Sequence, residues 1–236
     1  MMKKYPIIIL LILVSSIMSG CMFPEDRLAA NQTPYEDQVQ SVQTAVNQFK
    51  EQNDGLLPIK NKEADTPLYE KYPIDFKKLA PQFMAEPPGN AFESGGIFQY
   101  VLVNVEENPT VKLIDLRMAE QLRDIQLRIK SHKYPPYDQE IASNVYSLKH
   151  DELGYEEEPY VVSPYSNNNL PLVISGDGRV YVDYSSELYA VLQKSKEKLK
   201  QGEDIRPLLY QDSVIAPGFS LPYTVDENNE PVFMVK

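Results

Sequence analysis

The clearest helical pattern in the chain lies between residues 33 and 55. Apolar residues recur there at intervals of three and four, which places them on one face of a helix. They are Val39, Val42, Val46 and Phe49. Thr33-Pro34-Tyr35-Glu36 forms a capping box with proline at the first helical position, and Asn53-Asp54-Gly55 provides a left-handed residue at the other end. The pattern therefore predicts an amphipathic helix between Thr33 and Gly55.

A strand pair followed by a helix is predicted from residue 97 onward. Residues 97–105 and 111–114 are mostly apolar and flank a turn at 106–110. Asp115 is placed to cap a helix whose apolar face repeats at helical spacing. That face contains Met118, Leu122, Ile125 and Ile129. Upstream, residues 56–96 are rich in proline and contain one predicted helical turn, from Asp75 to Leu79.

The same order of elements recurs near the C-terminus. Residues 170–174 and 179–184 predict a β-hairpin around Ser175-Gly176-Asp177-Gly178, with Asp177 and Gly178 taking positive φ angles. Ser185 or Ser186 is the expected cap of a helix that runs past Leu199 and ends at Gly202. A closing hairpin is predicted for residues 221–225 and 231–235. The recurrence is either a duplication that gives two similar halves or a coincidence, because few residues are identical.

These patterns predict an α+β fold in which three amphipathic helices pack on antiparallel β-hairpins. The stretch between the two halves is the hardest to interpret, because prolines, tyrosines and a run of acidic residues follow one another there; residues 144–148 and 160–163 are its predicted strands. The expected division of the chain is a signal peptide at 1–20, a tether at 21–32, an N-terminal half at 33–131, a Tyr/Pro-rich acidic connection at 132–169 and a C-terminal half at 170–236.

The first 21 residues predict where the protein is held. A basic start at Lys3-Lys4 precedes an unbroken apolar run at 7–14, and Met18-Ser19-Gly20-Cys21 closes the segment. This order is typical of an export signal that is cleaved before a cysteine carrying lipid, with Met18 in the place where leucine is usual. A plain signal peptide or an uncleaved span are the alternatives, but four small or polar residues interrupt the second half of a span. We expect a lipid anchor on Cys21 at the extracytoplasmic face of the cell membrane.

Composition limits the function classes. Removing the first 20 of 236 residues leaves 216, and losing Lys3 and Lys4 changes the net charge from −11 to −13. Such an acidic surface disfavours nucleic acid as a partner, because phosphates bind lysine and arginine. Cationic ligands are favoured over anions. Cys21 is the only cysteine, so the exported fold has no disulfide and depends on packing.

The chain shows no pattern typical of an enzyme, a metal site or a cofactor site. His132 and His150 lie in polar segments without a recognisable partner, and Gly95-Gly96 precedes a strand rather than a helix. Asp177 and Gly178 are explained by their turn, and Glu156-Glu157-Glu158 by solvated charge. Core packing is the default role for the tyrosines of the middle stretch, and a protein-binding surface is the alternative. The residues of that surface would be Tyr134, Tyr137, Tyr155, Tyr160 and Tyr165.

Cys21, the first helix with Gly55-Leu56-Leu57-Pro58, the 175–184 hairpin and the 222–232 tail together resemble an uncharacterised lipoprotein family of Bacillus-type Gram-positive bacteria. Some of its members carry the label "ABC transporter periplasmic-binding protein". The resemblance implies a lipidated Cys21 and no catalytic or ligand residues. A fainter likeness links the segment around Asn53–Pro58 to pilin-like proteins, although the lipobox is a departure from them.

Three functions are therefore considered. The leading expectation is a non-enzymatic, lipid-anchored module that binds an unknown protein or small solute in the cell envelope. The second is a solute-binding lipoprotein of an ABC-type transporter for a cationic solute or metal, which requires two lobes and a cleft. The third is a wall hydrolase, which requires two cleft carboxylates with at least one perturbed pKa.

Overall fold

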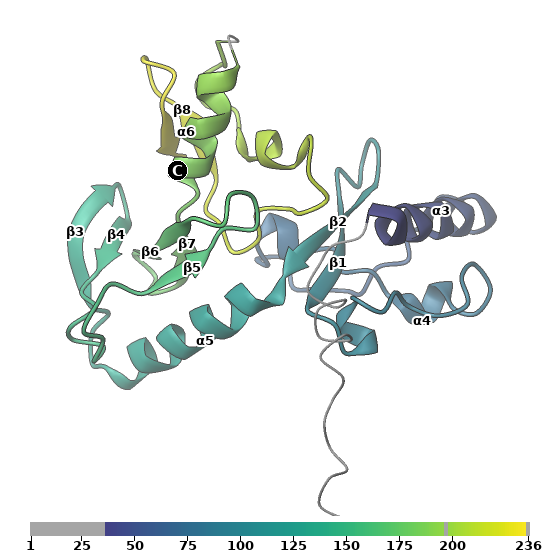
Figure 1. Cartoon of the computed structure of the whole chain (residues 1–236), viewed down its shortest axis with the longest axis horizontal. Coiled ribbons are helices and arrows are strands. Elements are labelled where there is room, and N and C mark those ends of the chain that lie inside the picture. The colour runs from purple at the N-terminus through teal and green to yellow at the C-terminus, as the bar shows by residue number, and fades with distance from the viewer. Residues whose placement is uncertain (1–35, 196–197, 235–236) are drawn as a thin grey trace, which may run out of the picture.

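The computed structural model describes residues 36–195 and 198–234, so the predicted signal peptide, the tether, Cys21 and the capping residue Thr33 lie outside the described residues. The fold is the predicted mixed α+β architecture with antiparallel hairpins (Figure 1). Its helices are α3 (Glu36–Gln52), α4 (Phe76–Leu79), α5 (Leu116–Ser131) and α6 (Ser185–Lys194). Its strands are β1 (Phe98–Val103), β2 (Thr110–Asp115), β3 (Tyr137–Ala142), β4 (Val145–Leu148), β5 (Tyr160–Val162), β6 (Asn169–Ser175), β7 (Val180–Val182), β8 (Tyr223–Val225) and β9 (Pro231–Phe233).

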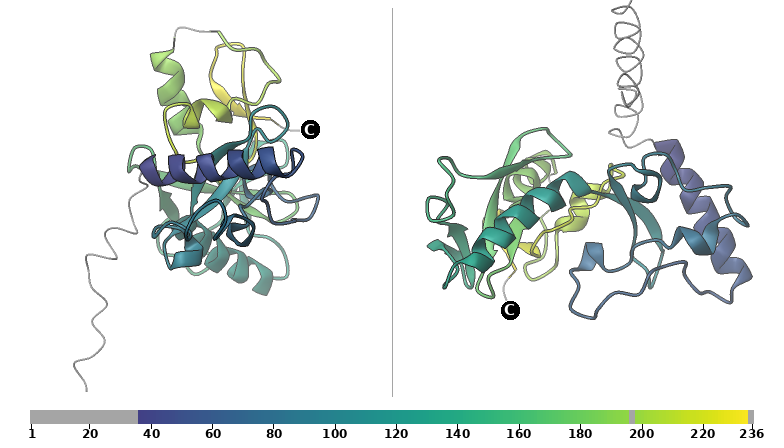
Figure 2. Two further views of the ribbon diagram at one scale, coloured as in Figure 1. Left: turned by 90° about the vertical axis from the view of Figure 1, so that its right-hand side faces the viewer. Right: turned by 90° about the horizontal axis from the view of Figure 1, so that it is seen from below.

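The N-terminal unit, residues 36–115, is built on the β1–β2 hairpin. Helix α3 lies beside this hairpin (Figure 2). It buries its predicted apolar face there, and Val42 and Val46 are fully enclosed. The Gln43 side chain accepts from the Val111 N–H at 2.7 Å and donates to the Pro109 carbonyl at 3.0 Å. The helix is thereby fixed to the start of β2 by polar contacts as well as by packing.

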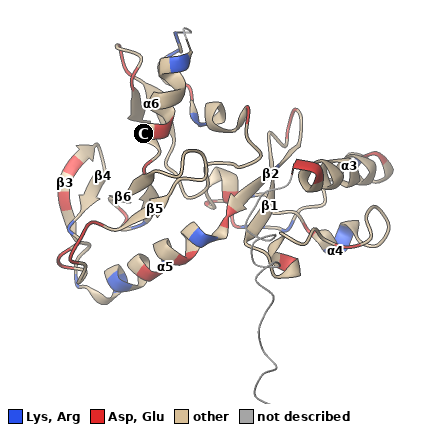
Figure 3. Cartoon of the chain, in the orientation of Figure 1, with Lys and Arg blue, Asp and Glu red and all other residues tan. Residues whose placement is uncertain are grey.

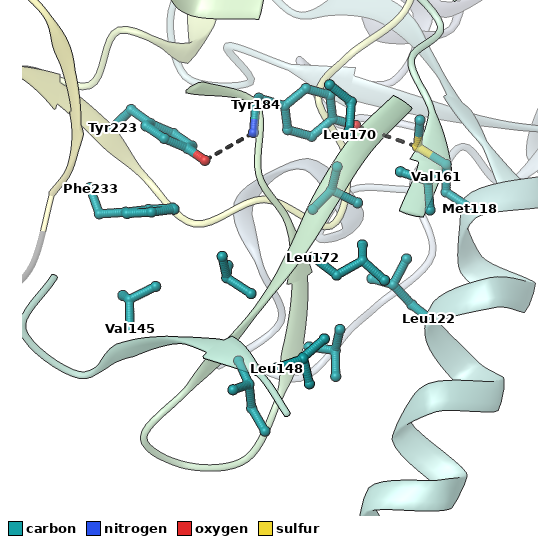
Figure 4. Close-up of a cluster of buried hydrophobic side chains, with 14 of the residues drawn as sticks. Met118, Leu122, Val145, Leu148, Val161, Leu170, Leu172, Tyr184, Tyr223 and Phe233 are labelled. Atoms are coloured by element: carbon teal, nitrogen blue, oxygen red, sulfur yellow. Dashed lines mark hydrogen bonds between the residues drawn. The ribbon is translucent and has the colours of Figure 1, made fainter. Parts of the chain in front are cut away.

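The C-terminal unit has a second core around a five-stranded antiparallel sheet. Strand β6 is its centre, because residues 173–175 pair with β4, 169–171 with β5 and 172–174 with β7, while β3 extends the sheet beyond β4. Helices α5 and α6 and the β8–β9 hairpin contribute to the same core (Figure 4). Within it, the Tyr223 hydroxyl donates to Asp183 Oδ1 at 2.7 Å and accepts from the Tyr184 N–H at 2.9 Å.

Residues 206–220, here called the strap, join the two units. The Leu113 N–H donates to the Val214 carbonyl, and the Ala216 N–H donates to the Leu113 carbonyl, both at 2.8 Å. The strap therefore forms a short parallel β-bridge with the edge of β2, between Leu113 and Ile215. Lys112 Nζ donates to the carbonyls of Tyr210 and Ser213, at 2.8 and 2.6 Å, and its burial lowers the lysine pKa.

A third, smaller core lies where the strap meets the N-terminal unit, and we call this contact region the seam. Its buried members come from both sides, and they are Tyr69, Val101, Val103, Ile114, Tyr210 and Ala216. Arg206 is buried beneath them, paired with Asp204 at 2.6 Å, and its guanidinium carbon lies 4.9 Å from the centre of the Tyr69 ring. Polar and apolar contacts thus close the seam together.

The core boundary differs from the predicted division at residue 131. The buried face of α5, including Met118 and Leu122, belongs to the C-terminal core, so packing changes units at Asp115. The hairpin–aspartate–helix order does recur: Asp115 accepts from the Arg117 N–H, and Asp183 accepts from the Ser185 N–H. The two hairpins nevertheless lie in sheets of different size, so the likeness of the halves is local.

The predicted ends of the last helix are wrong. Asp183 accepts from the Ser185 N–H, in place of a cap by Ser185 or Ser186, and the helix ends at Lys194 rather than Gly202. Beyond it, the Leu199 N–H donates to Asn229 and the Gly202 N–H to Thr224, which draws the chain onto the β8–β9 hairpin. Tertiary hydrogen bonds therefore outweigh helix propensity here.

Two other local predictions need correction. In the 175–178 turn only Gly178 has a positive φ, of 79°, while Asp177 accepts from the Arg179 N–H. Strand β3 was not predicted, because its exposed, acidic sequence lacks a buried alternation. The other predicted strands and the Asp115-capped helix are confirmed.

Glu70 gives the seam a testable pH dependence. Its Oε1 accepts from the Phe219 N–H of the strap, and its Oε2 is buried without a hydrogen-bond partner among the described residues. Burial raises the pKa of Glu70 from 4.5 to about 7. Because the folded state favours the protonated form, this group's contribution to stability is present below pH 4.5 and is lost as pH rises through 7.

We expect Glu70→Gln to raise the free energy of unfolding above pH 7 by up to about 3 kcal/mol, with little effect at pH 4.5. Denaturant unfolding at a series of pH values measures this. Glu63→Gln, on the exposed part of the same segment, is the control. An unchanged pH profile in Glu70→Gln would contradict the assignment.

Candidate functional site

A long hollow of the described surface runs along α5. One pocket of about 800 Å³ lies between α5 and residues 155–162, and a second of about 540 Å³ continues it toward Asp115 and Ile215. Glu120, Gln121 and Val162 line both pockets. We call the combined hollow the α5 groove; one wall is residues 115–125 and the other is residues 155–167.

The amphipathic sequence of α5 positions the helical wall. Leu122 and Ile125 are buried in the C-terminal core, so their neighbours Gln121 and Asp124 lie at the rim of the groove. The opposite wall is the chain that leads into β5, which runs beside α5 (Figure 1). A helix and an edge strand therefore face each other across the hollow.

The groove is strongly acidic. The larger pocket is lined by five carboxylates and by no lysine, arginine or histidine, and red segments mark both walls in Figure 3. Those carboxylates are Glu120, Asp124, Glu156, Glu157 and Glu158. Among the described residues, all except Asp124 lack an ion pair, and these four side chains are solvent-exposed. The groove thus concentrates negative charge that the fold itself does not neutralise.

Asp124 is held in a small polar cluster. The Tyr155 hydroxyl donates to its Oδ2 at 2.7 Å, and Arg128 Nε donates to the same oxygen at 3.0 Å. The guanidinium carbon of Arg128 also lies 4.4 Å from the centre of the Tyr155 ring, and one of its nitrogens donates to the Leu153 carbonyl. The bond from Tyr155, followed by that from Arg128, lowers the pKa of Asp124. Burial, with the Asp124 contact, raises the pKa of Tyr155 to about 12.

The inner end of the groove is closed by an ion pair. Asp115 is buried and caps α5; its Oδ1 accepts from Arg117 Nε at 3.0 Å, and its Oδ2 accepts from Arg117 Nη2 at 2.5 Å. This pairing raises the pKa of Arg117. Because Arg117 is engaged here, the one cation of the inner pocket is already neutralised by Asp115.

Two exposed apolar side chains complete the groove. Tyr160 and Val162 of β5 are 47% and 50% exposed, whereas Val161 between them is fully buried. Alternate residues of a strand point to opposite faces, so the exposed pair lies on the face away from the core. The groove therefore offers both apolar contact area and negative charge.

The five predicted tyrosines do not form one surface. Tyr155 and Tyr160 line the groove, but Tyr134 is an exposed residue beside Lys133, and Tyr137 packs on Tyr146 with its hydroxyl bound to the Gly176 carbonyl. Tyr165 is turned inward: its hydroxyl donates to the Ile215 carbonyl and its ring packs on Tyr184. Burial raises its pKa well above 10.

The helical half of the groove was missed from the sequence. Glu120, Gln121 and Asp124 read as the solvated face of α5, and only the fold brings residues 155–162 beside them. The run Glu156–Glu158 is evident in the sequence, whereas nothing in the sequence marks its helical counterpart.

Other site types find no support among the described residues. No group of three or more His, Cys, Asp or Glu side chains is arranged to hold a metal ion. No described helix has the length and apolar character needed to cross a bilayer. Cys21 lies outside the described residues.

Tyr155→Phe tests the polar cluster. Removing the hydroxyl should raise the pKa of Asp124 toward its ordinary value of 3.8, so this carboxyl should contribute a smaller loss of stability when the pH falls below 3.8. Carbon NMR titration of the Asp124 carboxyl measures the shift. Tyr134→Phe is the matched control; equal titration curves in both variants would contradict the assignment.

The comparison with known protein families gives a match to the N-terminal unit. Residues 35–115 match the YphF family N-terminal domain, a description that names no activity, ligand or partner. Searches of curated proteins and of solved structures gave no match. The matched segment ends at Asp115, where packing passes from one core to the other, so the part of the chain that resembles the YphF N-terminal domain corresponds to a packing unit of the fold.

Proposed function

We propose that this protein is a non-enzymatic binding module of the cell envelope, anchored by lipid on Cys21, that holds a cationic partner in the α5 groove. The observation that carries the proposal is the groove itself: five carboxylates on two facing walls, four of them without an ion pair among the described residues, beside exposed Tyr160 and Val162. Anchoring at the extracytoplasmic face and the resemblance to a lipoprotein family are parts of the same proposal.

The distribution of negative charge favours a cation that is long enough to contact both walls of the groove. Unpaired carboxylates on both walls attract lysine, arginine or amines from a distance and repel phosphate-bearing partners. A small ion does not need two walls of this extent, and the described carboxylates are not arranged to ligate a metal. A polycation or a basic polypeptide uses the whole groove.

The groove chemistry suits binding better than hydrolysis. Asp124, the carboxylate with a lowered pKa, is tied to Tyr155 and Arg128. Glu70, whose pKa is raised by burial, lies in the seam and not among the groove residues. The acid that a glycosidase mechanism needs is therefore not placed beside the groove carboxylates.

The alternative is a solute-binding lipoprotein of an ABC-type transporter. Its support is the inner pocket, which is lined from both units by Phe98, Met118 and Ile215. Closure of two lobes around a solute requires a hinge, whereas the strap bonds to β2 and buries a seam between the units. This rigidity favours a fixed groove over a closing cleft.

The negative charge of Glu156–Glu158, on the groove wall opposite α5, should control the affinity for a cationic partner. We expect the triple variant Glu156→Gln, Glu157→Gln, Glu158→Gln to weaken binding of a fluorescent lysine-rich peptide about tenfold at low salt. Fluorescence anisotropy with the full-length chain in mild detergent measures the dissociation constant. The matched control is Glu63→Gln, Glu106→Gln, Glu107→Gln, which removes the same charge from exposed sites of the N-terminal unit. Equal losses in the two triple variants would reject the groove as the site.

The anchor has a separate test. Cys21→Ala should abolish incorporation of labelled palmitate, because this one residue carries the acyl chains. Ser19→Ala, which keeps a small residue before the cleavage site, is the control. Retained labelling in Cys21→Ala would exclude lipidation at that residue.

A further inference from the structure

One edge of β5 has unpaired main-chain groups. The Ser163 N–H donates to the Asn168 carbonyl at 2.8 Å, and the Ser163 carbonyl accepts from the Asn167 N–H at 3.1 Å. The polar groups of residue 163 therefore face β6, and those of Val161 face the same way, opposite Leu170. Because successive residues of a strand alternate, the N–H and C=O groups of Tyr160 and Val162 point away from β6.

This outward edge is open in the described structure. Strand β5 pairs with β6 alone among the described strands, and Tyr160 and Val162 both line the α5 groove. Their main-chain groups make no other hydrogen bond within the described residues. Pro164 ends the row, because it has no N–H to offer. The edge is thus short and faces a hollow of about 800 Å³.

The surroundings of the edge specify its occupant. Val161 is buried against Met118 and Leu122 of α5, so that face of the sheet is directed at the helix (Figure 4). In a strand added beside β5, alternate side chains would approach α5 near Glu120 and Asp124. The intervening side chains would lie next to Tyr160 and Val162. Basic residues suit the positions near the carboxylates of α5, and apolar residues suit the positions next to Tyr160 and Val162.

We propose that β5 and α5 together bind an extended polypeptide segment with alternating basic and apolar residues, which adds to the sheet as a new edge strand beside β5. This inference rests on the proposed function and names its partner class. Main-chain hydrogen bonds to Tyr160 and Val162 supply affinity, and the groove carboxylates select the basic residues.

A second copy of this chain is the less suitable occupant. Pairing of two β5 edges would bring two acidic α5 grooves to one interface, where their negative charges repel each other. A polyamine can pair with the carboxylates, but it has no peptide groups to form hydrogen bonds with the open edge of β5. A basic peptide in extended conformation meets both demands.

The experiment separates the hydrogen bonds from the side chains. A short capped peptide of alternating lysine and valine is titrated into the full-length chain in mild detergent, and binding is measured by anisotropy. Val162→Pro removes one outward N–H without removing a bond to β6, and Val162→Ala removes the same apolar contact but keeps the N–H. We expect Val162→Pro to bind about tenfold more weakly than Val162→Ala, with spermine binding equal in both.

Hydrogen exchange gives an independent readout in the unaltered chain. The amides of Tyr160 and Val162 should become protected when the peptide binds and remain unprotected with spermine. Melting temperatures of the two variants confirm that each is folded. Peptide binding that depends on Glu156–Glu158 but leaves these amides unprotected would overturn strand addition and keep the proposed function. Failure of peptide and spermine alike to bind would overturn both, and dimerisation without peptide would identify a second copy as the occupant.

Discussion

The two hydrogen bonds between Leu113 and the strap determine how the rest of the molecule is arranged. They extend the β1–β2 hairpin with a strand from the C-terminal unit, and the other edge is extended by residues 72–74. A lone two-stranded hairpin is barely stable in water, so the sheet of the N-terminal unit depends on chain from both sides of it. The same contact lies beside the seam core, which contains Tyr69, Tyr210 and Ala216.

The groove follows from the same arrangement. Helix α5 continues directly from β2 through Asp115, and its inner face is held in the C-terminal core. Its direction is therefore set by both units. The chain that returns to β5 runs beside the helix and leaves the outward edge of a short strand opposite a charged helical rim. A fixed seam and a fixed helix keep these two walls apart, which suits a site that receives a segment from outside.

Patterns with a local physical cause could be predicted from the sequence. The apolar spacing of α3 and α5, the Asp115 cap and the 170–182 hairpin each depend on neighbouring residues, and each is present. The end of α6 could not be predicted, because Asn229 and Thr224 lie far along the chain. Tyr165 gave no sequence sign that it would turn toward Ile215 rather than toward solvent. The groove joins an ordinary solvated helix face to a distant acidic run, and only tertiary contacts reveal that meeting.

The strap also has a consequence for the order in which the protein can fold. Leu113 and Val214 are separated by about a hundred residues, and contacts of that range form late, because a long loop must close first. During synthesis, one edge of β2 stays unpaired until residues 214–216 have been made. An unpaired edge is a template for wrong partners. The N-terminal unit is therefore made first but remains open to wrong strand pairing until the strap, about a hundred residues later, has been made.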